Sequence, residues 1–412
     1  TLFPYTTLFR SDRAIDKLIT PVISRQEYIN VFVLESIATK VKDIGKLTPG
    51  DVKQLKMLVN MGADIREMNK ELARLSNLQV KDIKSIIKTV AIDAHLDAKP
   101  LYDYRHKKFI PYEKNKRLQN IVKAVNKITA GTYRNISNSR AVGFLIRDLK
   151  HPNTLKFQSI EDTYQSVVDE AIQAVKSGVD YRVAIRRTLK QLSDSGIRRL
   201  SWESGYTQRL DTAVRRNVLE GVRAINQEVE NTVGKELNAD GIELSAHINC
   251  AVDHEPFQGH IFTTEEFERL QSNLDFTDID GQTFAAVDRV IGQYNCRHVA
   301  RSMILGVSKP RYTKQQLEKI IQDNHEGYEL NGKHLTMYEC TQLQRKLETR
   351  IRYAKDEQII MQSAGNMDAA RLARKKVINL TREYTMFSKD CGLSIKKDRI
   401  EVAGYRPIKQ NK

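Results

Sequence analysis

The sequence predicts a mainly α-helical protein with a small α+β module embedded in it. Apolar residues recur at helical spacing through most of the chain, whereas after Gly241 they alternate with polar residues. Helical spacing returns after Pro310. Because 412 residues are too many for one ordinary core, we expect an elongated helical N-terminal part, the α+β module and a C-terminal helical hairpin.

The changes of pattern divide the chain into five segments. Residues 1–11 read like the in-frame translation of a sequencing adapter, so we expect them to be an artefact outside the fold. The other segments are a helical region over 12–150, basic amphipathic helices over 151–237, the α+β module over 238–310, and a helical hairpin with a basic tail over 311–412.

Two apolar stripes predict helices in the N-terminal part, where helical spacing predominates from residue 12 to about 237. One stripe runs from Tyr164 to Val175 and stops at Gly178, a residue type that commonly ends helices. The other runs from Leu210 to Val229. Several arginines lie off this second stripe, so we expect an amphipathic and basic helix.

Local signals also predict the elements of the module and of the segment after it. Residues 242–248 alternate with period two and indicate a strand. Thr263 and Glu266 form a capping box, in which a Thr and an acid or amide three residues later mark a helix start. Thr313 and Gln316 form a second one.

The C-terminal segment predicts two long helices with a short connection. Asn331-Gly332 is a turn signal that precedes them. Residues 336–364 and 367–388 have the composition and spacing of charged helices, and Gly365-Asn366 breaks the pattern between them. A short connection between long helices favours an antiparallel hairpin.

The charge of the chain favours a polyanionic partner. The net charge is +16, which promotes contact with nucleic acid or an acidic surface, although a merely basic soluble protein is an equally good interpretation. For any one cluster of basic residues, a solvated helix face is the alternative to phosphate contact. The candidates for non-specific contact with DNA are Arg186, Arg187, Lys190, Arg374 and Lys375.

Hydropathy and cysteine usage exclude two other classes. No apolar run in the sequence reaches the ~18 residues that a membrane-spanning helix needs, so we expect no membrane contact. The four cysteines are widely spaced and include no Cys-x-x-Cys, which is unlike a secreted disulfide framework. We therefore expect synthesis in a reducing cytoplasm.

Histidine and cysteine are crowded into one block of the module. Four of the nine histidines and two of the four cysteines lie between Ser245 and His298. Imidazole and thiolate are the usual zinc ligands, but the spacing is not that of a standard zinc finger, and a hydrogen-bonded polar framework is the alternative. We expect the framework to consist of His247, His254, Gln258, Gly259, Asn295, Cys296 and His298, with Cys250 and His260 as additional ligands if metal binds.

The same block does not predict an enzyme. Cys296 with a nearby histidine has the composition of a nucleophile pair, but the sequence does not indicate an exposed thiol of lowered pKa. Neither a phosphate-binding glycine loop nor a nucleophile-elbow motif occurs in the sequence. We therefore expect no catalytic residues and no cofactor, with zinc as the alternative.

The block resembles the signature of a known family. The pieces that carry the resemblance are Ser245-Ala246-His247, Asp253-His254, Gln258-Gly259 and Asn295-Cys296-Arg297-His298, and it continues into Tyr338–Glu348 and the closing glycines. Together they resemble the tailed-bacteriophage minor capsid protein family called phage minor capsid protein 2, which is related to the phage Mu type head-morphogenesis proteins. The resemblance covers about 200–410. Cys250 is not a position of the family motif, which counts against a site with four zinc ligands.

The resemblance implies a structural protein of the virion. It implies a minor component of the phage head, associated with the portal protein and other capsid proteins near packaged DNA, and made in the bacterial host cytoplasm. In this setting Arg297 pairs either with a carboxylate or with DNA. The alternatives are a phage-encoded DNA-binding assembly factor and a metal-dependent enzyme or toxin-like module.

Overall fold

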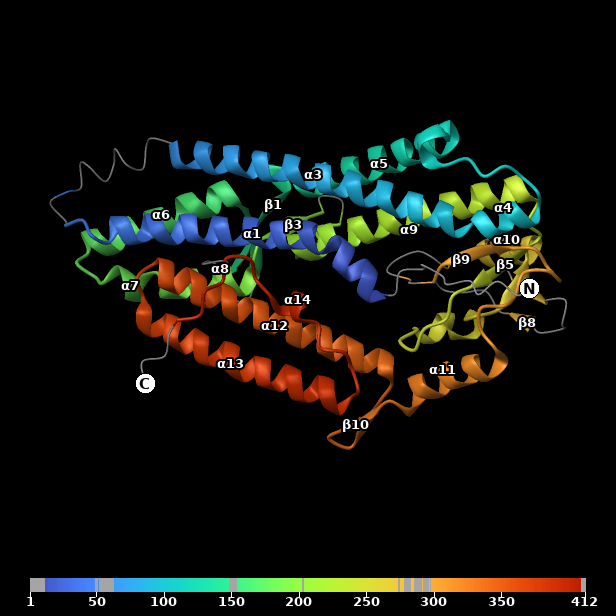
Figure 1. The fold of residues 1–412 in the computed structure, drawn as a ribbon. Helices are drawn as coiled ribbons and strands as arrows, with labels where there is room; N and C mark the ends of the chain where they lie inside the picture. Colours follow the sequence, from blue (N-terminus) through green and yellow to red (C-terminus); the bar gives the residue numbers. More distant parts are fainter. Residues whose placement is uncertain are drawn as a thin grey trace. The chain divides into compact units, whose positions relative to one another are not determined.

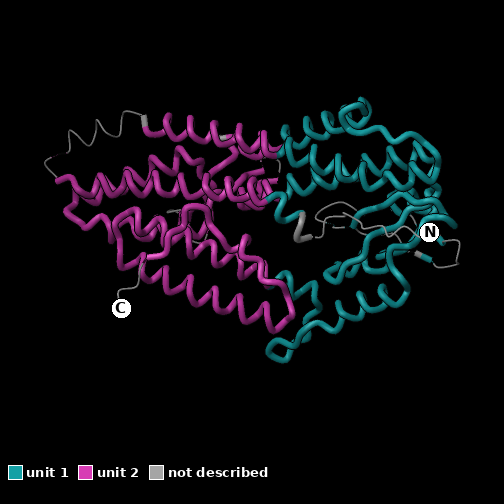
Figure 2. Tube along the Cα trace, viewed as in Figure 1, with its two compact units in different colours: residues 1–19, 83–131, 216–343 teal, residues 20–82, 132–215, 344–412 magenta. Residues whose placement is uncertain are grey.

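The computed structural model confirms a mainly helical protein with small antiparallel sheets (Figure 1). It describes residues 12–48, 51, 63–147, 154–201, 204–272, 275–277, 283–284, 291, 296 and 298–408. The chain divides into two compact units (Figure 2). Unit 1 contains residues 1–19, 83–131 and 216–343, and unit 2 contains residues 20–82, 132–215 and 344–412.

Five long helices of the described part of the chain supply residues to both units, because each boundary between the units falls inside one of these helices. These helices are α1 (Asp12–Ile44), α3 (Ala63–Asp97), α5 (Lys116–Ile136), α9 (Leu210–Leu237) and α12 (Met337–Ser363). The stripe predicted between Leu210 and Val229 lies on α9 and is buried along its length. Shorter elements of the same region are α4 (Lys99–Tyr104), η2 (Tyr112–Lys114) and η3 (Ser139–Ala141).

In unit 1, α9 approaches α5 closely. Asn217 donates a hydrogen bond from Nδ2 to the Thr129 carbonyl oxygen at 3.0 Å. One turn further along, a Cβ at Gly221 would lie 2.6 Å from Cγ2 of Thr129, so only glycine fits there without a shift.

Unit 2 contains a four-stranded antiparallel sheet of order β2-β1-β3-β4. Its strands are β1 (Val142–Arg147), β2 (Leu155–Ser159), β3 (Arg198–Leu200) and β4 (Thr207–Arg209). Sequence analysis predicted helical spacing here and did not predict this sheet. The strands are short, and β2 and β3 are exposed or half-buried throughout, so they lack the alternation that identifies a strand.

Three helices lie between β2 and β3 along the chain. They are α6 (Ile160–Lys176), α7 (Tyr181–Ala184) and α8 (Arg186–Ser195). The Ser159 side chain caps α6 by accepting a hydrogen bond from the Asp162 backbone N–H. The helix ends just before Gly178, which has a φ of +69° as a C-terminal glycine should, and this prediction is confirmed.

The predicted α+β module lies in unit 1 around a three-stranded antiparallel sheet of order β6-β5-β9. Its elements are β5 (Gly241–Leu244), η4 (Val252–Phe257), β6 (Ile261–Thr263), α10 (Thr264–Gln271), β7 (Phe276–Thr277), β8 (Thr283–Phe284) and β9 (Ala300–Met303). The capping box at Thr263 and Glu266 is present, whereas β5 ends earlier than the predicted 242–248 strand.

The elements that follow confirm the predicted capping box, turn and hairpin. Thr313 and Gln316 cap α11 (Lys314–Glu326). Asn331 and Gly332, both with positive φ, join β10 (Tyr328–Leu330) to β11 (Lys333–Leu335). Helix α12 then leads through Gly365 to α13 (Met367–Asp390), and α14 (Lys397–Ile400) follows. In unit 2, the two long helices share a core formed by Leu347, Ile351, Ala354, Val377, Leu380 and Tyr384.

Unit 2 also buries a cluster of charged side chains. Arg209 pairs with Asp211 at 3.2 Å and with Asp356 at 3.5 Å. Arg352 pairs with Asp211 at 2.6 Å and with Glu27 at 3.9 Å. Each charge of Arg209, Arg352, Asp211 and Asp356 therefore has an opposite charge beside it, which offsets part of the cost of removing it from water.

Candidate functional site with histidine and cysteine

The candidate site lies beside the three-stranded sheet of unit 1, where β5 gives way to a loop. The backbone N–H of Ser245 donates to the Val299 carbonyl oxygen at 3.0 Å, and the Val299 N–H donates to Oγ of Ser245 at 2.9 Å. At the end of the ladder between β5 and β9, the Ser245 hydroxyl thus takes the place of a backbone carbonyl as hydrogen-bond acceptor. This exchange fixes the loop that begins at Ser245 to the segment that leads into β9.

The Gln258-Gly259 pair holds the other end of this loop. The buried Gln258 side chain accepts a hydrogen bond through Oε1 from the His247 backbone N–H at 2.8 Å. Gly259 has a φ of +66°, and a Cβ there would lie 2.1 Å from Cδ2 of Leu317. The backbone conformation therefore favours glycine, and a Cβ there would also require the Leu317 side chain to shift.

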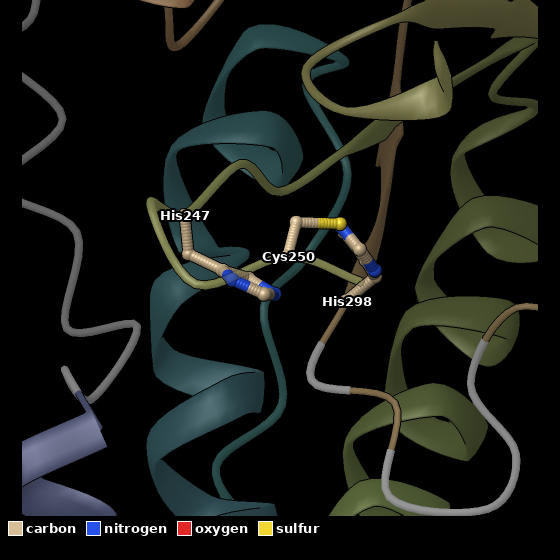
Figure 3. Close-up of side chains that lie close together, drawn as sticks. All are labelled: His247, Cys250 and His298. Carbon is tan, nitrogen blue, oxygen red and sulfur yellow. The ribbon is translucent and has the colours of Figure 1, made fainter. Parts of the chain in front are cut away.

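The loop brings histidine and cysteine side chains together. Sγ of Cys296 lies 3.3 Å from Nδ1 of His254 and 3.2 Å from Nδ1 of His298. The opposite ring nitrogen of His298, Nε2, lies 3.6 Å from Sγ of Cys250. His298 is thus placed between the two sulfur atoms, and Figure 3 shows it with Cys250 and His247.

Two of the imidazoles are deeply buried, since His254 is 2 % exposed and His298 is 4 % exposed. Cys250 is buried as well, whereas Cys296 and His247 are partly exposed. The His247 and His298 rings are stacked, with centroids 4.7 Å apart and planes at 29°. The His254 and His298 rings meet edge to face, at 5.6 Å and 60°.

Acidic residues of η4 approach two histidines from outside the cluster. A carboxylate oxygen of Asp253 lies 3.7 Å from Nε2 of His254, the nitrogen that faces away from Cys296. Glu255 accepts a hydrogen bond from Nδ2 of Asn324 at 3.1 Å and lies 2.8 Å from Nε2 of His325. These contacts join η4 to α11.

The arrangement offers two groups of three metal ligands that share His298. One group is His247, Cys250 and His298, and the other is His254, Cys296 and His298. Within each group the ligand atoms lie within 4.8 Å of one another. The same atoms also form a compact polar framework. The metal site and the hydrogen-bonded framework, which the sequence suggested as alternatives, therefore involve the same side chains.

The structure therefore brings together five of the predicted site residues: His247, Cys250, His254, Cys296 and His298. Gln258 and Gly259 shape the loop around them. His260 lies elsewhere, with its ring 4.3 Å from that of Phe262, and belongs to neither ligand group among the described residues. Asn295 and Arg297 lie outside the described residues, as do residues 1–11.

Sequence reasoning missed Tyr312, which also holds the loop. Its hydroxyl accepts a hydrogen bond from the Ala246 N–H at 3.1 Å and lies 3.4 Å from the Ala246 carbonyl oxygen. The two residues are 66 positions apart in the chain, so no local pattern could have paired them.

The predicted basic residues lie on α8 and α13 of unit 2. Arg186, Arg187 and Lys375 are exposed. Lys190 pairs with Asp194 at 2.6 Å, and Arg374 donates to the Tyr405 hydroxyl at 3.2 Å. Glu357 of α12 lies 3.9 Å from Lys190 and 2.9 Å from Lys376, so the basic faces of α8 and α13 meet at one carboxylate.

The structure thus defines a mainly helical protein with a small α+β module that contains a histidine and cysteine cluster. The chain matches the family model described as phage minor capsid protein 2 over residues 12–388, and it belongs to that family. The resemblance seen in the sequence is thereby confirmed. Comparisons with curated proteins and with solved structures give no match. Among the described ranges, no helix combines the length and the apolar character needed to cross a membrane.

Proposed function

We propose that this protein is a low-copy structural component of a tailed-phage head, located at the portal vertex or the capsid interior. The match to a minor capsid protein family over residues 12–388 carries the proposal. A minor component contacts the portal protein and other capsid proteins rather than forming the shell itself. In this role the protein acts without catalysis, and it is made in the cytoplasm of the bacterial host.

Quantitative peptide mass spectrometry on nuclease-treated, density-purified particles tests this proposal. We expect peptides from residues 12–412 at a small fraction of the major capsid protein, and chemical cross-links to the portal protein in the same particles. Peptides in the lysate of infected cells but not in particles would overturn the proposal. That result would favour the alternative of a DNA-binding assembly factor.

We also propose that the protein contacts packaged DNA without sequence specificity, mainly through unit 2. The support is the net charge of +16 and the meeting of two basic helix faces at Glu357. Arg186, Arg187 and Lys375 are exposed there and free to approach phosphates from solvent. Neutralising phosphates releases counterions, so the affinity must fall as salt rises.

The salt dependence of DNA binding measures this contact. Replacing Arg186, Arg187 and Lys375 with Gln removes three charges and should reduce the slope of log K against log salt by about 2.7 for duplex DNA. The matched control replaces three exposed lysines of unit 1 with Gln, namely Lys309, Lys314 and Lys333. An equal change of slope in both triple variants would show that α8 and α13 are not the contact surface.

A further inference from the structure

The geometry points to a metal site, and we propose that His254, Cys296 and His298 bind one zinc ion through Nδ1, Sγ and Nδ1. This site supplies two nitrogens and one sulfur, a donor set that favours zinc over harder ions. The proposal is independent of where in the particle the protein lies.

The distances between the donor atoms fit a tetrahedral ion. Zinc binds nitrogen at about 2.0–2.1 Å and sulfur at about 2.3 Å, so neighbouring sulfur and nitrogen ligands lie roughly 3.6 Å apart. Sγ of Cys296 lies 3.3 Å and 3.2 Å from the two nitrogens. Each of these distances has to lengthen by only a few tenths of an ångström to accommodate the ion. The described residues supply three of the four positions of such an ion.

The orientation of the rings separates this group from the other one. Two imidazoles bound to one tetrahedral ion hold their centroids roughly 5.2 Å apart and diverge from the ion. The His254 and His298 rings, at 5.6 Å and 60°, already have this arrangement. The His247 and His298 rings are stacked at 29°, so they would have to rotate before both could bind one ion.

The outer contacts also favour this group. A histidine that binds a metal commonly directs its other nitrogen to a carboxylate or another acceptor, which fixes the ring. Asp253 lies 3.7 Å from Nε2 of His254, and Sγ of Cys250 lies 3.6 Å from Nε2 of His298. Asp253 and Cys250 are therefore positioning residues rather than ligands. Its contact with His298 explains why Cys250 lies close to the ion without being one of its ligands.

The ion would connect two segments that β6, α10, β7 and β8 separate along the chain. His254 lies in η4 and Cys296 lies 42 residues later, ahead of β9. Cys296 packs at the same time against the core of the module. Zinc bound here would link these two segments and couple metal binding to the folding of the module.

Metal analysis of the full chain tests the proposal. The protein is produced in zinc-containing medium, purified without chelator and analysed by elemental mass spectrometry, and we expect roughly one zinc per chain. Cys296→Ser and His254→Ala should lose the zinc. His247→Ala is the matched control, because it removes the same side-chain type from the other group, and it should keep the zinc. Cys250→Ser should keep the zinc with lower affinity, because Cys250 only positions His298.

Cobalt binding keeps the test decisive if Cys296→Ser fails to fold. Cobalt(II) added to the metal-free wild-type chain should produce intense tetrahedral absorption bands together with a thiolate charge-transfer band, and zinc should abolish both. A folded wild-type chain that binds neither zinc nor cobalt would overturn the proposal. Loss of zinc in Cys250→Ser with retention in Cys296→Ser would equally overturn it, because the other group would then hold the ion.

Discussion

Replacing Glu27 with Gln should make the protein less sensitive to pH between pH 5 and pH 7. Glu27 is 5 % exposed, and burial raises the pKa of its carboxyl from 4.5 to about 8. The positive charge of Arg352 offsets part of this effect, whereas the carboxylates of Asp211 and Asp356 add to it. The folded chain therefore keeps a proton on Glu27 over a range in which the unfolded chain has lost it.

The sign and size of the effect follow from this difference. Because the folded-state pKa of an acid is raised, the contribution of Glu27 to stability is greatest below pH 4.5 and falls as the pH rises towards 8. One pH unit with one proton of difference corresponds to about 1.4 kcal/mol. Between pH 5 and pH 7, wild type should therefore lose about 2.5 kcal/mol that Glu27→Gln does not lose.

Urea denaturation at pH 5 and pH 7, followed by circular dichroism, measures the effect. The informative quantity is the change with pH in the free energy of unfolding of the variant relative to wild type, because titrating groups that do not interact with Glu27 cancel. Glu161→Gln, which removes one exposed negative charge from α6, is the matched control for the loss of a carboxylate. A relative stability of Glu27→Gln that is equal at the two pH values would refute the reasoning.

Two further predictions concern the loop of the module. Gly259→Ala should lower the free energy of unfolding by more than Gly178→Ala does. Both glycines have positive φ, so both substitutions strain the backbone. A Cβ at residue 259 would in addition meet Leu317, whereas a Cβ at residue 178 would meet no atom within 4 Å. Thermal melting of both variants measures this, and equal losses would contradict it. Tyr312→Phe should cost about 1 kcal/mol by removing the hydroxyl that bonds Ala246, and hydrogen exchange should show the Ala246 amide losing protection. Unchanged protection of that amide would count against the contact.

Sequence patterns predicted the elements whose signals are local. A capping box depends on residues three apart, so Thr263 with Glu266 could be recognised without any tertiary information. The break at Gly365-Asn366 likewise separated two helices, and Asn366 does cap α13. The sheet of unit 2 could not be found in this way. Its pairing of β1 with β3 joins segments more than fifty positions apart, and most of its strand residues lack a buried face.

The site was predictable in composition but not in geometry. Crowding of histidine and cysteine predicted that these side chains meet, yet spacing alone could not show which ring nitrogen faces which sulfur. The structure places Cys296 and Cys250 at opposite nitrogens of His298. This placement gives a physical reason why the two cysteines need not be equivalent, although they are the same residue type. The division into domains proposed from the sequence stays a prediction.

The small size of the module explains why polar groups are concentrated in it. Its sheet has strands of three or four residues, and its buried cluster contains Leu244, Phe257, Phe262, Leu270, Ile291 and Ala300. A core of this size stabilises a fold weakly, and small domains commonly add a cross-link or a metal. Ser245, Gln258 and Tyr312 fix the loop by hydrogen bonds to backbone. The proposed zinc ion would act in the same way, which suits a structural role for the block better than a catalytic one.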